Sequence, residues 1–264
     1  METGQVIKST GSWYYVKRPA GDILPCRIRG NFRVKGIKAT NPVAVGDVVH
    51  YEIAEQEGTG LIHDIEPREN YIIRKSSRLS KQYQLIACNV DQLVLMVSLR
   101  EPRTHLEFID RFLVSAEAYR IPAVLLFNKT DLYDQETSLD MEIYMHFYRH
   151  AGYPCYPVSV KTRKGLEAVA QLFRDKTSVL SGNSGVGKSS LLNALNPELE
   201  LKTDLVSNTH KAGKHTTTYA EMHAMPFGGW VIDTPGIKGF GTIDIEKAEL
   251  FHFFPEIFRE SQGC

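Results

Sequence analysis

The stretch that decides the fold is Gly182–Ser189, which reads Gly-Asn-Ser-Gly-Val-Gly-Lys-Ser. An apolar segment, Ser178–Leu180, precedes it, and a run of helical period, Ser190–Leu195, follows it. A G-x-x-x-x-G-K-S sequence between strand and helix predicts a phosphate-binding loop, because glycines permit the tight turn and the helix N-terminus attracts anions. The residues expected to contact a nucleotide here are Gly182, Asn183, Ser184, Gly185, Val186, Gly187, Lys188, Ser189 and Ser190. Among them, Lys188 should reach the β- and γ-phosphates and Ser189 should bind magnesium.

Apolar strands alternate with helical segments around this loop, from residue 91 to residue 242. Strands are predicted at Gln92–Leu99, Ala123–Phe127, Cys155–Val158 and Trp230–Ile232, and helices at Leu106–Ala116, Glu142–His150 and Leu166–Phe173. This alternation is typical of an α/β domain with a mainly parallel sheet.

Two further motifs follow predicted strands of this domain. The first, Asn128-Lys129-Thr130-Asp131, would choose the base, because an ionised Asp131 accepts the N1–H and N2–H₂ donors of guanine, which adenine lacks. Ser159 and Val160, after the next strand, would bring a backbone N–H to guanine O6. The second motif, Asp233–Gly236, puts a carboxylate at the end of a strand, where Asp233 would act on magnesium and the Gly236 N–H would sense the γ-phosphate.

The first 72 residues have a different pattern, with short β-prone runs between turn signals and no long helical period. This pattern predicts a small all-β barrel of the OB type, although an SH3-like barrel would give much the same sequence. Residues 1–38 hold eight Lys or Arg and two acidic residues, a net charge of +6. We expect Trp13 and Tyr15 in the barrel core, and RNA phosphate contacts from Arg27, Arg29, Arg33 and Lys35. Residues 73–90 are expected to be a basic linker.

The composition excludes several classes of protein. The chain has 264 residues, 42% of them hydrophobic, with a formal net charge of zero. No apolar run approaches the roughly 20 residues that span a bilayer, and the N-terminus lacks the pattern of a secretory signal. Four scattered cysteines predict reduced thiols. We therefore expect a cytoplasmic protein without membrane contact. We also expect a monomer.

The order of the motifs resembles that of one particular GTPase family. In ordinary GTPases the phosphate loop precedes the N-K-x-D motif, whereas here Asn128 and Ser159 precede Gly182. Together with the N-terminal barrel, this order resembles the circularly permuted ribosome small-subunit-dependent GTPase A (RsgA) family. The sequences Val45-Gly46-Asp47 and Gly213–Thr218 also fit that family.

The resemblance implies a GTP hydrolase of late small-subunit maturation, with Mg²⁺ as cofactor and GTP or GDP, the small ribosomal subunit and its rRNA as partners. It assigns Thr217 to magnesium and the γ-phosphate. It also assigns His215 to the attacking water, because Ile237 stands where many GTPases have a glutamine. Residues 243–264 would begin a C-terminal helical and zinc module. Cys264 would be its first zinc ligand, and zinc is expected only with the complete module.

Two other interpretations remain open from the sequence. One is a non-catalytic RNA-binding module whose nucleotide domain only senses GTP and GDP, as Ile237 would allow. The other is a general P-loop ATPase, which Asn128–Asp131 argues against. Particle-dependent turnover distinguishes the first from a GTPase, and competition between GTP and ATP distinguishes the second.

Overall fold

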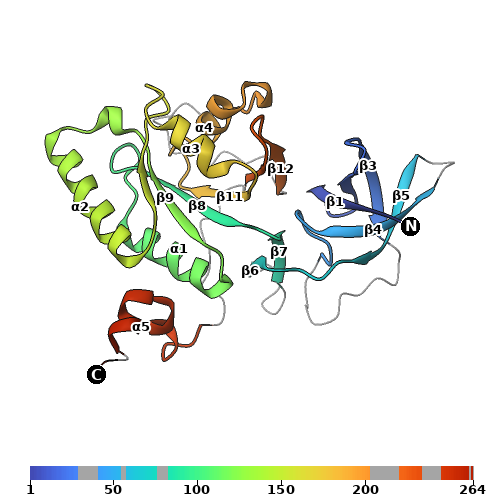
Figure 1. Cartoon of the computed structure of the whole chain (residues 1–264), viewed down its shortest axis with the longest axis horizontal. Helices are drawn as coiled ribbons and strands as arrows, with labels where there is room; N and C mark the ends of the chain where they lie inside the picture. The colour runs from blue at the N-terminus through green and yellow to red at the C-terminus, as the bar shows by residue number, and fades with distance from the viewer. Residues whose placement is uncertain are drawn as a thin grey trace, which may run out of the picture. The chain divides into compact units, whose positions relative to one another are not determined.

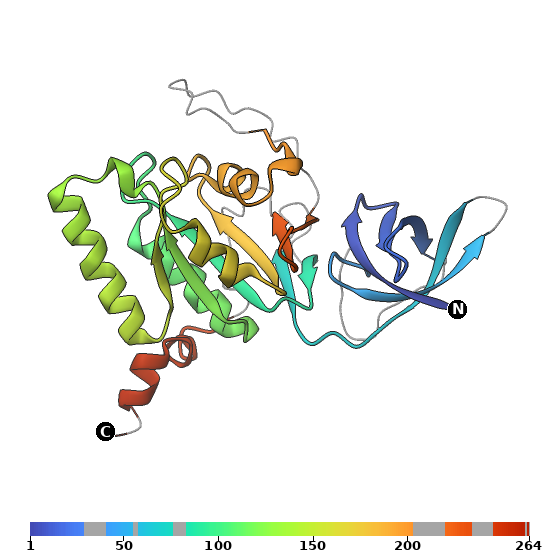
Figure 2. The ribbon, with the colours of Figure 1, turned by 45° about the horizontal axis from the view of Figure 1, so that its top comes forward.

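A computed structural model describes residues 1–28, 41–54, 58–75, 83–202, 220–233, 245–261 and 263 (Figures 1 and 2). The chain divides into two compact units. Of the described residues, the first comprises those within 1–90 together with 220–223, 232 and 233, and the second comprises the others. Each unit is described separately below.

Five strands of the first unit form the barrel. They are β1 (Glu2–Ser9), β2 (Tyr14–Lys17), β3 (Ile23–Ile28), β4 (Val48–Ala54) and β5 (Thr59–Ile65). Their order is β1-β2-β3-β5-β4, and a pairing of β1 with β4 closes the barrel. Strands β3 and β5 run parallel, whereas the other pairs are antiparallel. The closed five-stranded arrangement confirms the OB-type barrel. Because β5 lies between β3 and β4, the strands do not form the simple meander of an SH3-like barrel.

The aromatic residues of β2 correct one expectation. Tyr14 and Val16 point into the barrel core, whereas Trp13 and Tyr15 are only half-buried. The alternation of a strand was right, but its phase was wrong by one residue, because Val16 and Tyr14 share the face that meets Tyr51 and Ile62. Trp13 is thereby left at the surface, where the Arg27 guanidinium lies 4.1 Å from its ring centroid.

The segment expected to be a linker contains regular structure. Strands β6 (Tyr71–Lys75) and β7 (Tyr83–Cys88) pair antiparallel, with Tyr71 opposite Cys88 and Lys75 opposite Tyr83. Part of the basic run, residues 76–82, lies outside the described residues.

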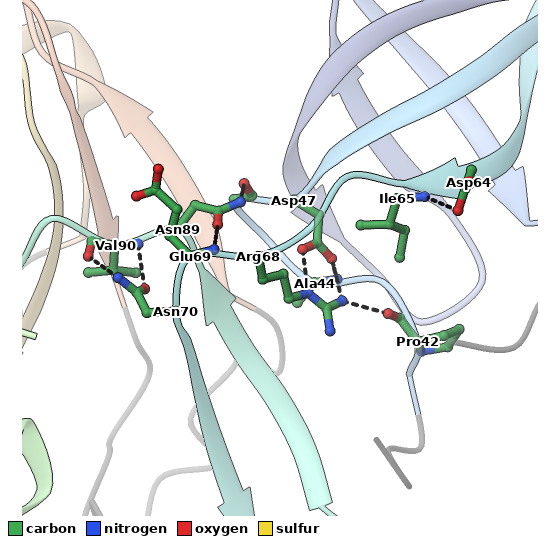
Figure 3. Close-up of polar contacts among 11 residues, drawn as sticks. Pro42, Ala44, Asp47, Asp64, Ile65, Arg68, Glu69, Asn70, Asn89 and Val90 are labelled. Carbon is green, nitrogen blue, oxygen red and sulfur yellow. Dashed lines mark hydrogen bonds and ion pairs between the residues drawn. The ribbon is translucent and has the colours of Figure 1, made fainter. Parts of the chain in front are cut away.

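A buried ion pair holds the loops beside this hairpin (Figure 3). The Arg68 guanidinium donates to both carboxylate oxygens of Asp47 at 2.7 Å and to the Pro42 carbonyl at 2.7 Å. The Asp47 carboxylate, fully buried, also accepts from the Ala44 N–H. The Asn70 side chain exchanges two 2.8 Å hydrogen bonds with the Val90 backbone. Removing one partner of a buried ion pair typically costs about 3 to 5 kcal/mol of stability. The Arg68–Asp47 pair and the hydrogen bonds around it therefore hold the loops beside the hairpin in place.

The second unit is built on a sheet with helices on both faces (Figure 2). Its strands are β8 (Gln92–Val97), β9 (Ala123–Phe127), β10 (Cys155–Pro157) and β11 (Thr177–Gly182). Two more strands, β12 (Glu221–Ala224) and β13 (Trp230–Asp233), each have residues in both units. Its α-helices are α1 (Leu106–Tyr119), α2 (Gln135–Ala151), α3 (Leu166–Phe173), α4 (Lys188–Leu195) and α5 (Pro255–Ser261). Short 3₁₀ helices cover Thr130–Leu132, Pro197–Leu199 and Leu250–Phe253. The order of its strands is β10-β9-β8-β11, and all four run parallel.

The sequence predicted most of these elements within a few residues. Strand β12 was not predicted, and among the predicted elements the largest difference is α2, which begins at Gln135 rather than at Glu142. Its start is fixed by Asp134, whose carboxylate accepts a hydrogen bond from the Thr137 N–H at 2.9 Å as an N-cap. Cys26, Cys88 and Cys155 are buried free thiols, as expected, and Cys264 lies outside the described residues. Within the described ranges, no helix has the length and apolar character needed to cross a membrane.

Candidate nucleotide-binding site

The phosphate loop joins β11 to α4 at the carboxyl edge of the parallel strands. Gly182, Gly185 and Gly187 all have positive φ, a region that other L-residues rarely adopt. Side chains at two of these positions would also meet neighbours. A Cβ on Gly182 would lie 2.5 Å from the Met96 carbonyl oxygen, and one on Gly187 would lie 2.5 Å from Asn128 Nδ2. The loop therefore needs glycine both for its shape and for space.

Lys188 is the first residue of α4, and its side chain turns back over the loop. Its Nζ donates to the carbonyls of Gly182 at 2.8 Å and Asn183 at 3.1 Å. The ammonium group thus lies inside the curve of the loop, where it can meet a phosphate. Ser189 and Ser190 follow in the first turn of α4, with Ser189 at the position expected to bind a metal ion.

Asn128 joins the base loop to the phosphate loop. It lies directly after β9 and is 2% exposed. Its Nδ2 donates to the Val186 carbonyl at 2.8 Å, and its Oδ1 accepts from the Val160 N–H at 3.2 Å. One buried amide therefore ties together three loops that follow β9, β10 and β11, although these loops are far apart in the sequence.

Asp131 faces the loop after β10. Ser159, fully buried, donates its hydroxyl to Asp131 Oδ1 at 2.6 Å, and the same hydroxyl accepts from the Thr162 N–H at 3.1 Å. Lys161 Nζ is 4.0 Å from Asp131 Oδ2, and the Asp131 side chain is 13% exposed. The carboxylate is thus oriented before any ligand arrives, which is what selective recognition of two N–H donors requires.

Lys129 and Thr130 complete the base loop. Lys129 adopts the left-handed conformation at φ +64°, and its Nζ donates to the Glu101 carbonyl. Burial lowers the pKa of Lys129, while the charges of Glu101 and Asp131 oppose that shift. The Thr130 hydroxyl donates to the Val158 carbonyl at 3.1 Å, which holds the loop against the end of β10.

Tyr133 is a supporting residue that the sequence analysis missed. Its hydroxyl donates to the Asn128 carbonyl at 2.7 Å and accepts from the Leu99 N–H at 2.9 Å. Burial raises the pKa of Tyr133, so the hydroxyl stays protonated and keeps its donor. A tyrosine two residues beyond an N-K-x-D motif gives no sequence signal of its own, because its partners lie in the segment after β8 and in its own loop.

Asp233 is the last residue of β13, a neighbour of β11 in the sheet. Its carboxylate is a hard oxygen ligand of the kind that Mg²⁺ prefers, and the Ser189 hydroxyl is another, so each of these side chains suits the ion by its own chemistry. Three other expected residues, His215, Thr217 and Gly236, lie outside the described residues, as do Arg29, Arg33, Lys35 and Cys264. Among the described residues, no three His, Cys, Asp or Glu side chains gather as a metal cluster.

Comparison with protein-family models identifies the chain. A model described as RsgA GTPase matches residues 65–243, and one described as RsgA N-terminal domain matches residues 3–62. The chain belongs to the RsgA GTPase family.

Curated RsgA relatives are similar over almost the whole chain. A small ribosomal subunit biogenesis GTPase RsgA of Bacteroides fragilis is 52% identical over 261 residues, covering 99% of this chain and 84% of the relative. A protein of the same name from Flavobacterium johnsoniae is 51% identical over 265 residues, covering 99% and 81%.

Two solved structures share the fold of this chain. YjeQ from Thermotoga maritima superimposes with a TM-score of 0.77 at 35% identity, covering 97% of this chain and 82% of that one. YloQ, described as a circularly permuted GTPase, gives a TM-score of 0.74 at 35% identity, covering 100% and 81%. A circularly permuted α/β GTPase domain preceded by an OB-type barrel is therefore confirmed.

Proposed function

We propose that this chain hydrolyses GTP to GDP and phosphate in the maturation of the small ribosomal subunit. The observation that carries the GTPase part is the Asn128 side chain, which bonds to the phosphate loop and to the Ser159 loop at once. A guanine motif and a phosphate loop that are joined by a 2.8 Å hydrogen bond belong to one nucleotide site. The printed names of the curated relatives support the ribosomal part.

In this site, the base would lie against Asp131, whose acceptor oxygens match guanine and not adenine. The Lys129 stem would cover the ring, and the Ser159–Lys161 backbone would meet O6. Bringing a phosphate to the loop would draw Lys188 away from the carbonyls of Gly182 and Asn183 and onto the β- and γ-phosphates. Ser189, Asp233 and Thr217 would hold a magnesium ion. When bound, that ion neutralises charge on the β- and γ-phosphate oxygens.

Hydrolysis by water in line with the leaving group relies on positioning and on charge neutralisation. Ile237 cannot hydrogen-bond a water molecule, so we assign the water to His215, with Thr217 closing over the γ-phosphate. The ribosomal particle would bring these residues into place. Hydrolysis would then release them and the particle.

The barrel would supply the RNA contacts. Arg27 is exposed and packs over Trp13, so one face of the barrel combines a cation with an aromatic surface. Arg29, Arg33 and Lys35 extend the positive charge along the sequence. A chain that binds the small subunit would act in the cytoplasm. Its affinity for the subunit's RNA should fall steeply as the salt concentration is raised.

The test is phosphate release from GTP and from ATP, with and without purified small subunits, at fixed magnesium and low salt. We expect the chain to hydrolyse GTP but not ATP. We expect the subunits to stimulate GTP hydrolysis strongly. His215→Ala should keep GTP affinity near that of the wild type and lose most of the stimulated turnover. A rate that the subunits leave flat would contradict a particle-stimulated GTPase and favour the GTP/GDP sensor. Equal turnover of ATP would contradict the base assignment.

A further inference from the structure

The segment that follows β8, residues 98–104, lies against the base loop, and we call it the β8 loop. Its two ends are joined, because the Thr104 N–H donates to the Ser98 carbonyl at 2.7 Å and the Ser98 N–H donates to Thr104 Oγ1 at 3.1 Å. Both of these residues are buried. The Leu99 N–H donates to the Tyr133 hydroxyl at 2.9 Å. The β8 loop is therefore fixed at its ends beside the nucleotide site.

The middle of the β8 loop holds the Lys129 side chain. The Glu101 carbonyl accepts a hydrogen bond from Lys129 Nζ. Glu101 has φ +43°, in the left-handed region that residues other than glycine rarely adopt. Such a conformation persists only where the surrounding structure enforces it. The direction of the Glu101 carbonyl, and with it the place of the Lys129 ammonium group, therefore depends on what holds this part of the loop.

Arg100 ties the middle of the β8 loop to helix α2. Its Nε and Nη2 donate to the Thr137 hydroxyl at 3.1 and 3.0 Å, and Nη2 also donates to the Asp134 carboxylate. Asp134 is the N-cap of α2 and follows the base loop by three residues. Hydrogen bonds from Thr137 and the charge of Arg100 lower the pKa of Asp134, so its carboxylate is ionised at neutral pH. A planar guanidinium can donate to both acceptors at once, which a lysine ammonium group does with less precision.

We propose that Arg100 is a positioning residue for guanine recognition, because it holds the Glu101 carbonyl where that carbonyl fixes the Lys129 ammonium group. The inference rests on the proposed guanine site, in which the Lys129 stem covers the base. A lysine side chain without such a partner samples many rotamers, and a ligand that needs one of them loses affinity in selecting it. Here the rotamer is selected before the nucleotide arrives. Since Arg100 acts through the base loop, GTP and GDP should benefit equally.

Arg100→Ala tests this role by equilibrium titration with GTP and GDP and by steady-state turnover of GTP. We expect the affinity for each nucleotide to fall roughly two- to tenfold, which corresponds to ordering one long side chain. KM for GTP should rise by the same factor, and kcat should stay within about twofold, because contacts to the base are the same in the ground state and the transition state. Unchanged affinities, or a fall in kcat with KM unchanged, would overturn the proposal. A wild-type chain that binds neither nucleotide would instead contradict the guanine site itself.

A double-mutant cycle tests the route through Lys129. Lys129→Met keeps the apolar stem and removes the ammonium group that the Glu101 carbonyl holds. In this background, Arg100→Ala should change GTP affinity by less than about twofold, since its effect requires the ammonium group. Equal losses of GTP affinity from Arg100→Ala in the two backgrounds would overturn the proposal.

Arg149→Ala is the matched control for damage to α2. Arg149 also ties α2 to a neighbouring segment, because its guanidinium donates to the carbonyl of Cys155 at the start of β10. The variant should lower the free energy of unfolding, measured with denaturant, and leave GTP affinity unchanged. If Arg149→Ala loses as much GTP affinity as Arg100→Ala, any loosening of α2 weakens the site, and the specific role of Arg100 is overturned.

Discussion

The phosphate loop and the base loop of the α/β unit acquire their shapes by different means. Gly182–Ser189 is shaped by its own backbone, with three glycines at positive φ and with Lys188 bonded to two carbonyls of the same loop. Asn128–Asp131 contains no glycine and is held by groups outside the motif, namely Tyr133 of the same loop, Ser159 and the Glu101 carbonyl. The information for the first loop is local, and that for the second is spread over the fold.

The two loops meet at one place, where Asn128 Nδ2 donates to the Val186 carbonyl beside Gly187. If this contact makes them a single site, damage there should affect both loops. Damage to the supports of the base loop should have smaller effects. The following substitutions test that order.

Gly187→Ala should have the largest effect. The new Cβ would lie 2.5 Å from Asn128 Nδ2, so the two loops would be forced apart. Misplacing catalytic groups by about 1 Å can reduce a rate by roughly 100-fold, and we expect a loss of this size in GTP turnover together with weaker binding of GTP and GDP. Gly152→Ala is the matched control, since Gly152 has nearly the same φ, +112° against +108°, and open space around it. Both variants should lose about 1 to 2 kcal/mol of unfolding free energy from strain. Equal nucleotide binding by the two variants would show that the contact with Asn128 is unimportant.

Asn128→Ala should have an intermediate effect. It leaves the Val186 carbonyl and the Val160 N–H without their partner, at a cost of about 1 to 3 kcal/mol. We expect roughly tenfold weaker binding of both GTP and GDP by calorimetry. Asn70→Ala provides the comparison, because Asn70 makes an equivalent pair of bonds to Val90 outside the site. It should lower the free energy of unfolding and leave nucleotide affinity unchanged, so a similar loss of affinity in both would indicate a general loss of stability.

Tyr133→Phe should have the smallest effect. It removes one hydroxyl that supports the Asn128 carbonyl and the Leu99 N–H, a change worth about 1 kcal/mol. GTP affinity should fall a few-fold. Tyr153→Phe also removes a single hydroxyl contact, to Glu117, and should leave GTP affinity unchanged. A Tyr133→Phe chain with wild-type affinity would mean that Asn128 and Asp131 are positioned without this support.

The same contrast explains what the sequence could predict. The phosphate loop was evident because its requirements lie within eight residues, and the permuted order of motifs was visible because order survives without a structure. Strand β1 and the hairpin β6–β7 were missed. The mostly polar sequence of β1 becomes a strand through pairing with β4. The hairpin strands are more apolar, but the basic run between them indicated a linker. Tyr133 was missed for a related reason, since it is Leu99 and Asn128, brought together by the sheet, that make its hydroxyl useful.

The central claim is that Asp131 selects guanine at the site containing the phosphate loop, and Asp131→Asn tests it most directly. Xanthine has a carbonyl where guanine has its 2-amino group, so an amide N–H at position 131 should exchange one preference for the other. Competition between GTP and XTP for the wild-type and variant chains is the measurement. We predict that the variant loses roughly 100-fold in GTP affinity and binds XTP more tightly than GTP. A folded Asp131→Asn chain that still prefers GTP would contradict the claim.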